Sequence, residues 1–352
     1  MAQTDFPTSK KILRIGWVGT GPFSFYGDYM RVINQPEPNP LSMRVTHIWG
    51  DNYTKNYAGT PEYVKKMLDY WNGDRQSPKG LASRYSIPNV CEDFHDMVDE
   101  VDAAMIMDFD RSYELAEPFL RKGMPIFLCS PVAVNVPECE KILDLAESNG
   151  SAVYTGSFTV DMPENTILYD RVRRENIESF FAYTYLGFFT SYANDGLEPV
   201  HRLIGGGVRR VALLGWDGSK GYDPTGIPLS RIHLEYEPRG DKPPIQGVLT
   251  LGGNEKSMEW YRVHFRDHTV EEGRTHWSRD YRLNFMDFLL ELQKLFTINK
   301  SSETRKDIIE KLRVVIAAYK SANEGGIPVK VDEIGDYRMP TVRIEKWNVI
   351  PG

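Results

Sequence analysis

The chain has 352 residues, more than one hydrophobic core usually serves, so two domains are expected. Its net charge of −7 and its lack of a long basic block exclude a protein that binds nucleic acid along the phosphate backbone. Hydrophobic residues (41%) and charged residues (26%) occur in globular proportions, and no apolar run approaches the roughly 20 residues that cross a bilayer.

The three cysteines, Cys91, Cys129 and Cys139, are odd in number and lack the spacing of a metal site. This pattern predicts reduced thiols and a cytoplasmic protein. The first residues lack the apolar core of a signal peptide, which agrees with that expectation.

The first half alternates apolar strands with helical patterns. Strands are expected at 11–21, 43–51, 101–110, 124–131 and 151–158. Helices are expected at 61–71, 94–101, 112–123 and 136–150. The alternation predicts a parallel sheet wound with right-handed crossovers, and the apolar strands fit a sheet covered on both faces.

A glycine turn follows the first strand. It reads Gly19-Thr20-Gly21-Pro22-Phe23-Ser24. In a dinucleotide site the first glycine makes the turn and the second lets pyrophosphate approach the backbone. The first five residues of this turn are therefore predicted to bind the cofactor. The acid Asp51, which ends the second strand, favours NAD over NADP because a carboxylate can accept hydrogen bonds from the ribose.

The second half has longer strands that no longer alternate with helices. Half-buried, antiparallel strands are expected at 177–189, 230–238, 246–253 and 258–267. Two helices are expected at 282–296 and 303–325. We predict a Rossmann domain over residues 1–157 and an α+β substrate domain with a large, open, mostly antiparallel sheet over residues 158–352. Such a sheet often buries one face against another subunit, so a homo-oligomer (dimer or tetramer) is expected.

The order of these features resembles the glucose–fructose oxidoreductase and inositol dehydrogenase (Gfo/Idh/MocA) family across nearly the whole chain. The segments that carry the resemblance begin with IGWVGTG and continue at 81–107, 119–158 and 312–331. The resemblance implies an enzyme that binds NAD or NADP and oxidises or reduces a carbinol carbon of a sugar, cyclitol or related polyol. It also implies a catalytic lysine in a Glu-Lys-Pro motif and a histidine or tyrosine early in the second domain.

Both catalytic elements of that family are altered in this chain. Cys129-Ser130-Pro131 stands in place of Glu-Lys-Pro, so Ser130 replaces the lysine. Ser130 can position an oxygen by hydrogen bonding but lacks the charge that lysine offers an alkoxide. In the second element, aligning Gly196 and Pro199 puts Glu198 at the histidine or tyrosine position, and a shifted alignment puts His201 there instead.

A helix starting at Pro199 would place Glu198 at its N-terminus, where backbone amides favour an ionised carboxylate. Such a carboxylate can take a proton from a substrate hydroxyl, and His201, three residues on, could relay it. The alternative is structural: a helix cap at Glu198, a packed His201, and a small Ser130 that fills a tight turn.

The resemblance further implies cofactor and substrate contacts at the ends of the strands expected at 101–110 and 124–131. The residues at these positions are Met107, Asp108, Phe109, Tyr113, Cys129 and Ser130. Asp108 and Asp110 could bind a polyol or act as an acid–base pair, and two buried carboxylates would raise each other's pKa. The competing interpretation is a solvated loop.

The sequence predicts no metal site. His264 and His268 have the i, i+4 spacing of a metal face, with His276 beyond, but that spacing serves a metal on a helix and this region is predicted as strand and turn.

Three functions remain open. The first is an NAD-dependent oxidoreductase for a sugar or polyol, with Glu198 or His201 moving a proton and with Ser130 and Asp108 positioning oxygen atoms. The second is a redox-neutral lyase or glycosidase that uses tightly bound NAD through a transient keto-sugar. The third is a nucleotide-binding sensor or partner subunit without catalysis, which the loss of the lysine favours.

Overall fold

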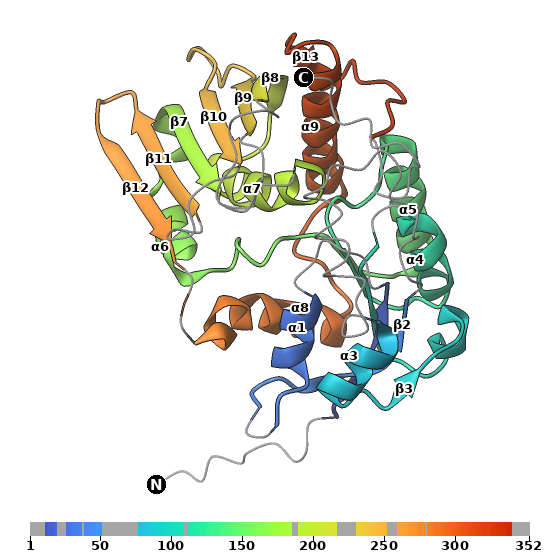
Figure 1. Ribbon diagram of the computed structural model, residues 1–352. Coiled ribbons are helices and arrows are strands. Elements are labelled where there is room, and N and C mark those ends of the chain that lie inside the picture. The colour runs from blue at the N-terminus through green and yellow to red at the C-terminus, as the bar shows by residue number, and fades with distance from the viewer. Residues whose placement is uncertain are drawn as a thin grey trace, which may run out of the picture.

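The computed structural model describes residues 11–19, 26–36, 39–50, 77–108, 111–184, 189–216, 230–251, 259–276, 278 and 280–339. These residues form two separate sheets with helices packed against them (Figure 1). The predicted combination of a parallel sheet and a second, mostly antiparallel sheet is confirmed.

The first sheet has six parallel strands in the order β3-β2-β1-β4-β5-β6. The strands are β1 (Leu13–Val18), β2 (Met43–Trp49), β3 (Asn89–Val90), β4 (Ala103–Ile106), β5 (Ile126–Leu128) and β6 (Val153–Tyr154). This order is that of a dinucleotide-binding Rossmann sheet, in which the chain switches direction across the sheet between β1 and β4. The ligand crevice of such a sheet lies at the carboxyl ends of these two strands.

The helices of the first half follow the prediction in part. They are α1 (Tyr26–Ile33), α3 (Pro78–Tyr85), α4 (Ser112–Arg121) and α5 (Val136–Asn149). α5 begins after an Asn135 cap and ends at Gly150 in the left-handed conformation, as its sequence predicts. The helix expected at 61–71 lies outside the described residues. The helix expected at 94–101 is wrong in type and length, because a capping box on Asp93 closes a short 3-10 turn, Phe94–Met97, just before β4.

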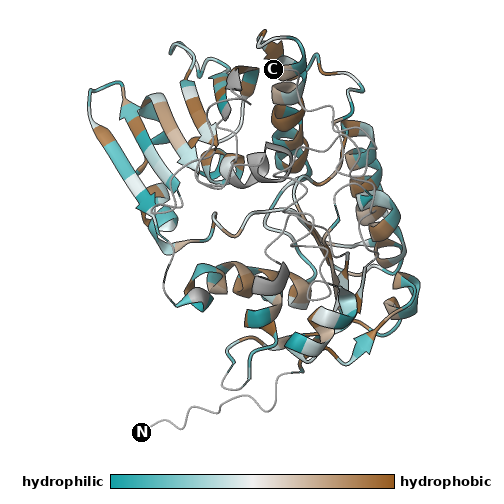
Figure 2. Cartoon of the chain, viewed as in Figure 1, coloured by the Kyte–Doolittle hydropathy of each residue, from teal (hydrophilic) through white to brown (hydrophobic). Residues whose placement is uncertain are grey.

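The second sheet has seven strands in the order β12-β11-β7-β10-β9-β8-β13. They are β7 (Ile177–Thr184), β8 (Val208–Trp216), β9 (Ser230–Tyr236), β10 (Gln246–Leu251), β11 (Glu259–Phe265), β12 (Val270–Thr275) and β13 (Val329–Lys330). Neighbouring strands are antiparallel except β7 and β10, which are parallel. Buried and exposed residues alternate along β7 and β11, and Figure 2 shows the matching change of hydropathy along the strands.

Among the described residues of the second half, four α-helices follow β6. They are α6 (Pro163–Arg171), α7 (Phe189–Ile204), α8 (Met286–Ile298) and α9 (Arg305–Asn323). α9 starts with a capping box between Thr304 and Asp307, and it packs on β8, on α7 and on α5 of the first half. Arg305 at its start forms ion pairs with Asp144 and Glu147 of α5, at 2.8 and 3.2 Å. α9 therefore joins the second sheet to the first.

α8 packs on the first sheet although it follows the second in sequence (Figure 1). Phe288 of α8 lies 5.3 Å from Tyr29 of α1 and 5.5 Å from Phe127 of β5 between ring centroids. Phe285, just before α8, lies 5.2 Å from the same tyrosine ring. One face of the Rossmann sheet is thus closed by a helix from beyond residue 157, and the boundary at 157/158 stays a prediction.

Replacing Phe288 by alanine should therefore destabilise the first sheet. We expect the free energy of unfolding to fall by about 3–5 kcal/mol, because the change removes a fully buried ring and leaves a cavity. Urea unfolding followed by circular dichroism measures the loss. Leu290→Ala in the same helix, at a side chain that is 38% exposed, is the control and should cost under ~1 kcal/mol. Equal losses in the two variants would contradict this account of α8.

Candidate functional site

Gly19 stands at the carboxyl end of β1, at the switch point of the first sheet. Its backbone φ is +99°, and its amide donates to the carbonyl of Trp49 at 2.8 Å. A Cβ atom here would lie 3.1 Å from the Cβ of Asp108. Both the left-handed backbone and this close approach require glycine. The other residues predicted to bind the cofactor in this crevice, Thr20 to Phe23 and Asp51, lie outside the described residues.

Asp108 lies two residues after the end of β4, beside this turn, and is buried, with 1% of its surface exposed. Its Oδ2 atom lies 3.1 Å from Nη2 of Arg111, whose guanidinium also stacks on the Trp49 ring at 5.5 Å. One described partner of the Asp108 side chain is thus a cation. Asp110 and Phe109 lie outside the described residues, so the proposed acid pair is untested. Met107 is buried, and its amide donates to Val18 at 2.7 Å.

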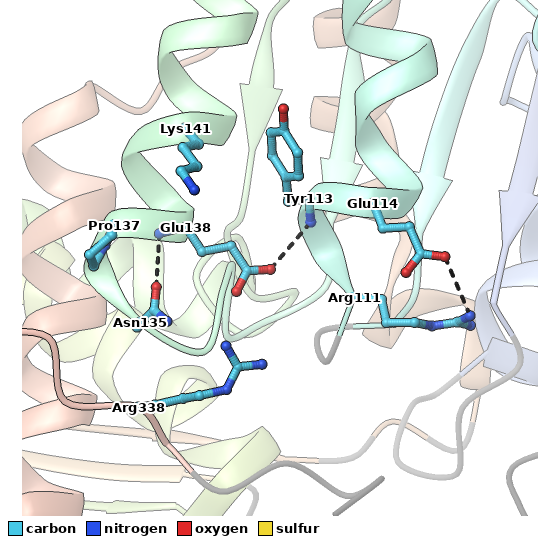
Figure 3. A pocket seen from close by; sticks show the side chains of 8 residues that line it. All are labelled: Arg111, Tyr113, Glu114, Asn135, Pro137, Glu138, Lys141 and Arg338. Atoms are coloured by element: carbon cyan, nitrogen blue, oxygen red, sulfur yellow. Dashed lines mark hydrogen bonds and ion pairs between the residues drawn. The ribbon is translucent and has the colours of Figure 1, made fainter.

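Tyr113 lines a cavity of about 490 Å³ at the N-terminal ends of α4 and α5 (Figure 3). Its amide donates to Oε1 of Glu138 at 3.5 Å, and burial raises the pKa of that carboxyl. Arg111 and Arg338 also line the cavity. A contact of Tyr113 with a cofactor therefore stays a prediction, since the described surroundings of this residue belong to the space between the two helices.

Ser130 follows β5 and is buried. Its hydroxyl donates to the carbonyl oxygen of Thr155 at 2.8 Å, just after the neighbouring strand β6. The amide of Cys129 donates to Ile106 at the end of β4, at 2.9 Å. The Cys-Ser-Pro turn therefore lies at the carboxyl edge of the sheet, with the serine hydroxyl oriented along that edge. The Ser130–Pro131 peptide bond is cis.

Glu198 does not stand at a helix N-terminus, so that prediction is wrong. α7 already starts at Phe189, and Pro199 lies inside it. An interior proline costs roughly 3 kcal/mol, which is offset here because residues 196–200 are all buried against the second sheet and α9. Gly196 permits this packing, since a Cβ there would lie 2.8 Å from Thr184. The helix ends at Ile204, just before Gly205.

The carboxylate of Glu198 is held by a buried lysine of α9 instead. Nζ of Lys311 lies 2.5 Å from Oε1 and 2.6 Å from Oε2 of Glu198. The same ammonium is paired with Glu303, just before α9. Burial by itself lowers the pKa of Lys311, but the two carboxylates outweigh burial and the net pKa is raised. We call Glu198, Lys311 and Glu303 the buried triad.

The triad is connected to the edge that holds Ser130. The amide of Thr155 donates to Oε2 of Glu303 at 2.6 Å, and the threonine hydroxyl lies 3.2 Å from the same oxygen. Since Ser130 donates to the carbonyl of Thr155, a continuous series of contacts runs from Ser130 to Glu198. The structure thus brings together two of the four predicted catalytic residues.

His201 faces the first turn of α9. Its Nε2 lies 3.9 Å from Oδ1 of Asp307 and is buried without a hydrogen-bond partner among the described residues. Burial, reinforced by the charge of Lys311, lowers the pKa of His201. The imidazole is therefore neutral at pH 7, which leaves one ring nitrogen able to accept a proton.

Sequence reasoning missed Asp161, Glu303 and Lys311. Asp161 lies in the segment that connects β6 to α6, two residues before α6 begins. Its Oδ2 is buried without a hydrogen-bond partner in the described chain, and burial followed by the charge of Glu291 raises its pKa to about 7. The position of Asp161 after a strand end was a usable signal. The sequence offers no such signal for Lys311, because it is one of several charged residues along a long helix.

The three histidines that were considered for a metal site are spread over strand and turn. His264 lies in β11, His268 in the turn after it, and His276 after β12. Within the described ranges, no group of three or more histidine, cysteine or acidic residues is placed to hold a metal ion.

Residues 13–157 match the family model described as "Oxidoreductase family, NAD-binding Rossmann fold" (GFO_IDH_MocA). The first half of the chain therefore matches the NAD-binding domain of the Gfo/Idh/MocA oxidoreductases, and the fold described above agrees with that family. The predicted resemblance is confirmed, and NAD as cofactor agrees with the family description. No curated protein matches the chain.

Solved structures of dehydrogenases share the fold over most of both chains. The myo-inositol dehydrogenase of Lactobacillus casei in complex with NAD(H) and myo-inositol has a TM-score of 0.68 at 11% identity, covering 91% of this chain and 96% of the other. The scyllo-inositol dehydrogenase of Lactobacillus casei with NAD(H) and scyllo-inositol has a TM-score of 0.65 at 14% identity, covering 92% and 100%. A probable dehydrogenase from Thermotoga maritima has 0.65 at 13% identity, also covering 92% and 100%.

Gly19→Ala should weaken NAD binding at least about tenfold, a loss of roughly 1.4 kcal/mol, because the new methyl group strains the turn and pushes on Asp108. Isothermal titration calorimetry with NAD measures the change. Gly150→Ala is the matched control: its φ is also positive, at +67°, but nothing lies within 4 Å of the added methyl group. An unchanged affinity in Gly19→Ala would remove this turn from the binding site.

Asp161 should make the protein less stable as pH rises. Its folded pKa of about 7 lies above its ordinary value of 3.8, so the folded state binds more protons between these values and the free energy of unfolding falls across this window. Asp161→Asn should therefore gain roughly 1–3 kcal/mol over the wild type above this window, with the gain disappearing below it. Thermal unfolding as a function of pH measures this difference. Asp170→Asn, at an exposed position, should show no such gain, and parallel pH curves for wild type and Asp161→Asn would refute the account.

Proposed function

We propose that the protein is an NAD-dependent oxidoreductase that acts on a hydroxyl-bearing carbon of a sugar, cyclitol or related polyol. The observation that carries the proposal is the series of contacts that joins Ser130, at the edge of the NAD-binding sheet, to the buried carboxylate of Glu198. The solved inositol dehydrogenases with bound NAD(H) and inositol support the polyol class.

The residues at the switch point fit NAD. Gly19 leaves the end of β1 open for a phosphate to approach, and Asp108 lies just after the end of the neighbouring strand. Asp51 is the residue that favours NAD over NADP. Bound NAD supplies an acceptor for the hydride that leaves the substrate carbon.

The proton-transfer set consists of carboxyl groups in this proposal. Glu198 accepts the hydroxyl proton of the substrate, and Ser130 orients the substrate oxygen. Asp161, whose pKa is about 7, is present in both protonation states near neutral pH and can donate or accept a hydrogen bond to a second hydroxyl. Asp108 forms an ion pair with Arg111 and so holds this arginine at the edge of the site. Neutral His201 packs α7, the helix that carries Glu198, toward Asp307 of α9.

We further propose that the protein acts in the cytoplasm as a homo-oligomer. All three cysteines are free thiols in the structure, which agrees with a reducing compartment. Among the described helices, none is both long and apolar enough to cross a membrane.

The substitution Glu198→Gln tests this proposal. We expect NAD binding to persist while kcat falls about 10²–10⁴-fold, because the amide cannot accept the proton. Absorbance of NADH with a panel of inositols and sugars measures turnover, and calorimetry measures NAD binding. Glu178→Gln, on an exposed position of β7, is the control. Full activity in Glu198→Gln would exclude Glu198 as the proton acceptor.

An assay of the nucleotide that is released when the purified protein is denatured distinguishes the oxidoreductase from the two other functions that the sequence left open. Stoichiometric NAD together with product but no net NADH would replace our proposal with the redox-neutral lyase or glycosidase. Exchangeable NAD with NADH formation supports the oxidoreductase. Absence of NAD binding, at any concentration that a calorimeter can test, would leave a protein without catalysis.

A further inference from the structure

Lys311 is almost completely buried, with 4% of its surface exposed, and both carboxylate oxygens of Glu198 contact its ammonium. Glu303 contacts the same ammonium from the other side of the triad. Burying a lysine without partners is very unfavourable, so these contacts explain how α9 can carry it.

The charge balance of the triad explains what the lysine does to its partners. Two carboxylates and one ammonium leave a net charge of −1 in a buried site. Without the ammonium, Glu198 and Glu303 would form a pair of like charges, and one of them would be driven to take up a proton. In contrast, the ammonium of Lys311, which lies within hydrogen-bonding distance, favours the ionised form of Glu198.

The triad is not needed for packing alone. Replacing a buried ion pair by apolar side chains of similar size is often neutral or even stabilising, so such a pair is weak evidence for a purely structural role. This triad also ends at the sheet edge, through Thr155, where Ser130 lies. It therefore fixes the position of Glu198 relative to the edge that our proposed function uses.

We propose that Lys311 is a positioning residue that keeps Glu198 ionised and fixed relative to Ser130. This inference rests on the proposed function, in which Glu198 receives the substrate proton. Around Glu198, the titratable groups that act on it or on its partner come from β6, α6, α7 and the α9 segment. Tyr154, Tyr169 and Lys311 interact with Glu198 itself, whereas His201, Glu303 and Asp307 interact with its partner Lys311. Lys311 is the cation in direct contact with the carboxylate.

The test is Lys311→Met, which keeps the length of the side chain and removes its charge. Two readouts are recorded: the pH profile of kcat, and the infrared C=O band of protonated carboxyl groups at neutral pH. We expect the acidic limb of the profile to move up by at least about one pH unit, and a protonated-carboxyl band to appear. The band should persist in Lys311→Met/Glu303→Gln and be lost in Lys311→Met/Glu198→Gln, and the two results together assign it to Glu198.

Two further variants complete the test: one is a control, and the other replaces Lys311→Met if that variant does not fold. Lys306→Met, on an exposed position of α9, should change neither readout. If Lys311→Met does not fold, Lys311→Met/Glu303→Gln removes one of the two buried carboxylates and the same readouts apply to it. An unmoved acidic limb, or no protonated Glu198 in a folded variant, would overturn the inference. If the wild type shows no turnover, the proposed function fails while the infrared band still decides the role of Lys311.

Discussion

The buried ammonium of Lys311 is the interaction on which the arrangement of the site depends. It is contacted by one carboxylate from α7 and by another from the segment before α9, and the second of these carboxylates also binds the backbone after β6. The ammonium of Lys311 therefore connects α7, the segment before α9 and the backbone after β6. In a low-dielectric interior such a set is stable only when every member is present, which makes its geometry well defined.

Glu198 and Asp161 have different environments, and the chemistry of the two carboxyl groups differs accordingly. Glu198 has a cation on both oxygens, whereas Asp161 has one buried oxygen without a hydrogen-bond partner in the described chain and a raised pKa. A site with two such carboxyls can hold one charged and the other partly protonated at neutral pH. This combination suits recognition of a polyol, because hydroxyl groups donate and accept hydrogen bonds at once.

Much of the fold could be predicted because its signals are local. The apolar strands of the first sheet, the cap and stop of α5, and the glycine after β1 follow from short stretches of sequence. Strands β8 and β12 were missed, since each contains charged residues that obscure the alternating pattern. The start of α7 was misplaced because Pro199 is normally a first-turn residue and tertiary packing kept it inside the helix. The role of Lys311 could not be predicted, because one of its partners, Glu198, is over a hundred residues away along the chain and the other, Glu303, lies before the start of α9.

The position of α8 affects how the two halves of the molecule can move. The chain passes from the first sheet to the second after β6, returns to the first to form α8, and crosses again to form α9. Three covalent crossings, together with the packed faces of α8 and α9, replace the single flexible tether of many two-domain proteins. Any relative motion of the two halves must therefore bend these crossings together and slide the packed faces of α8 and α9.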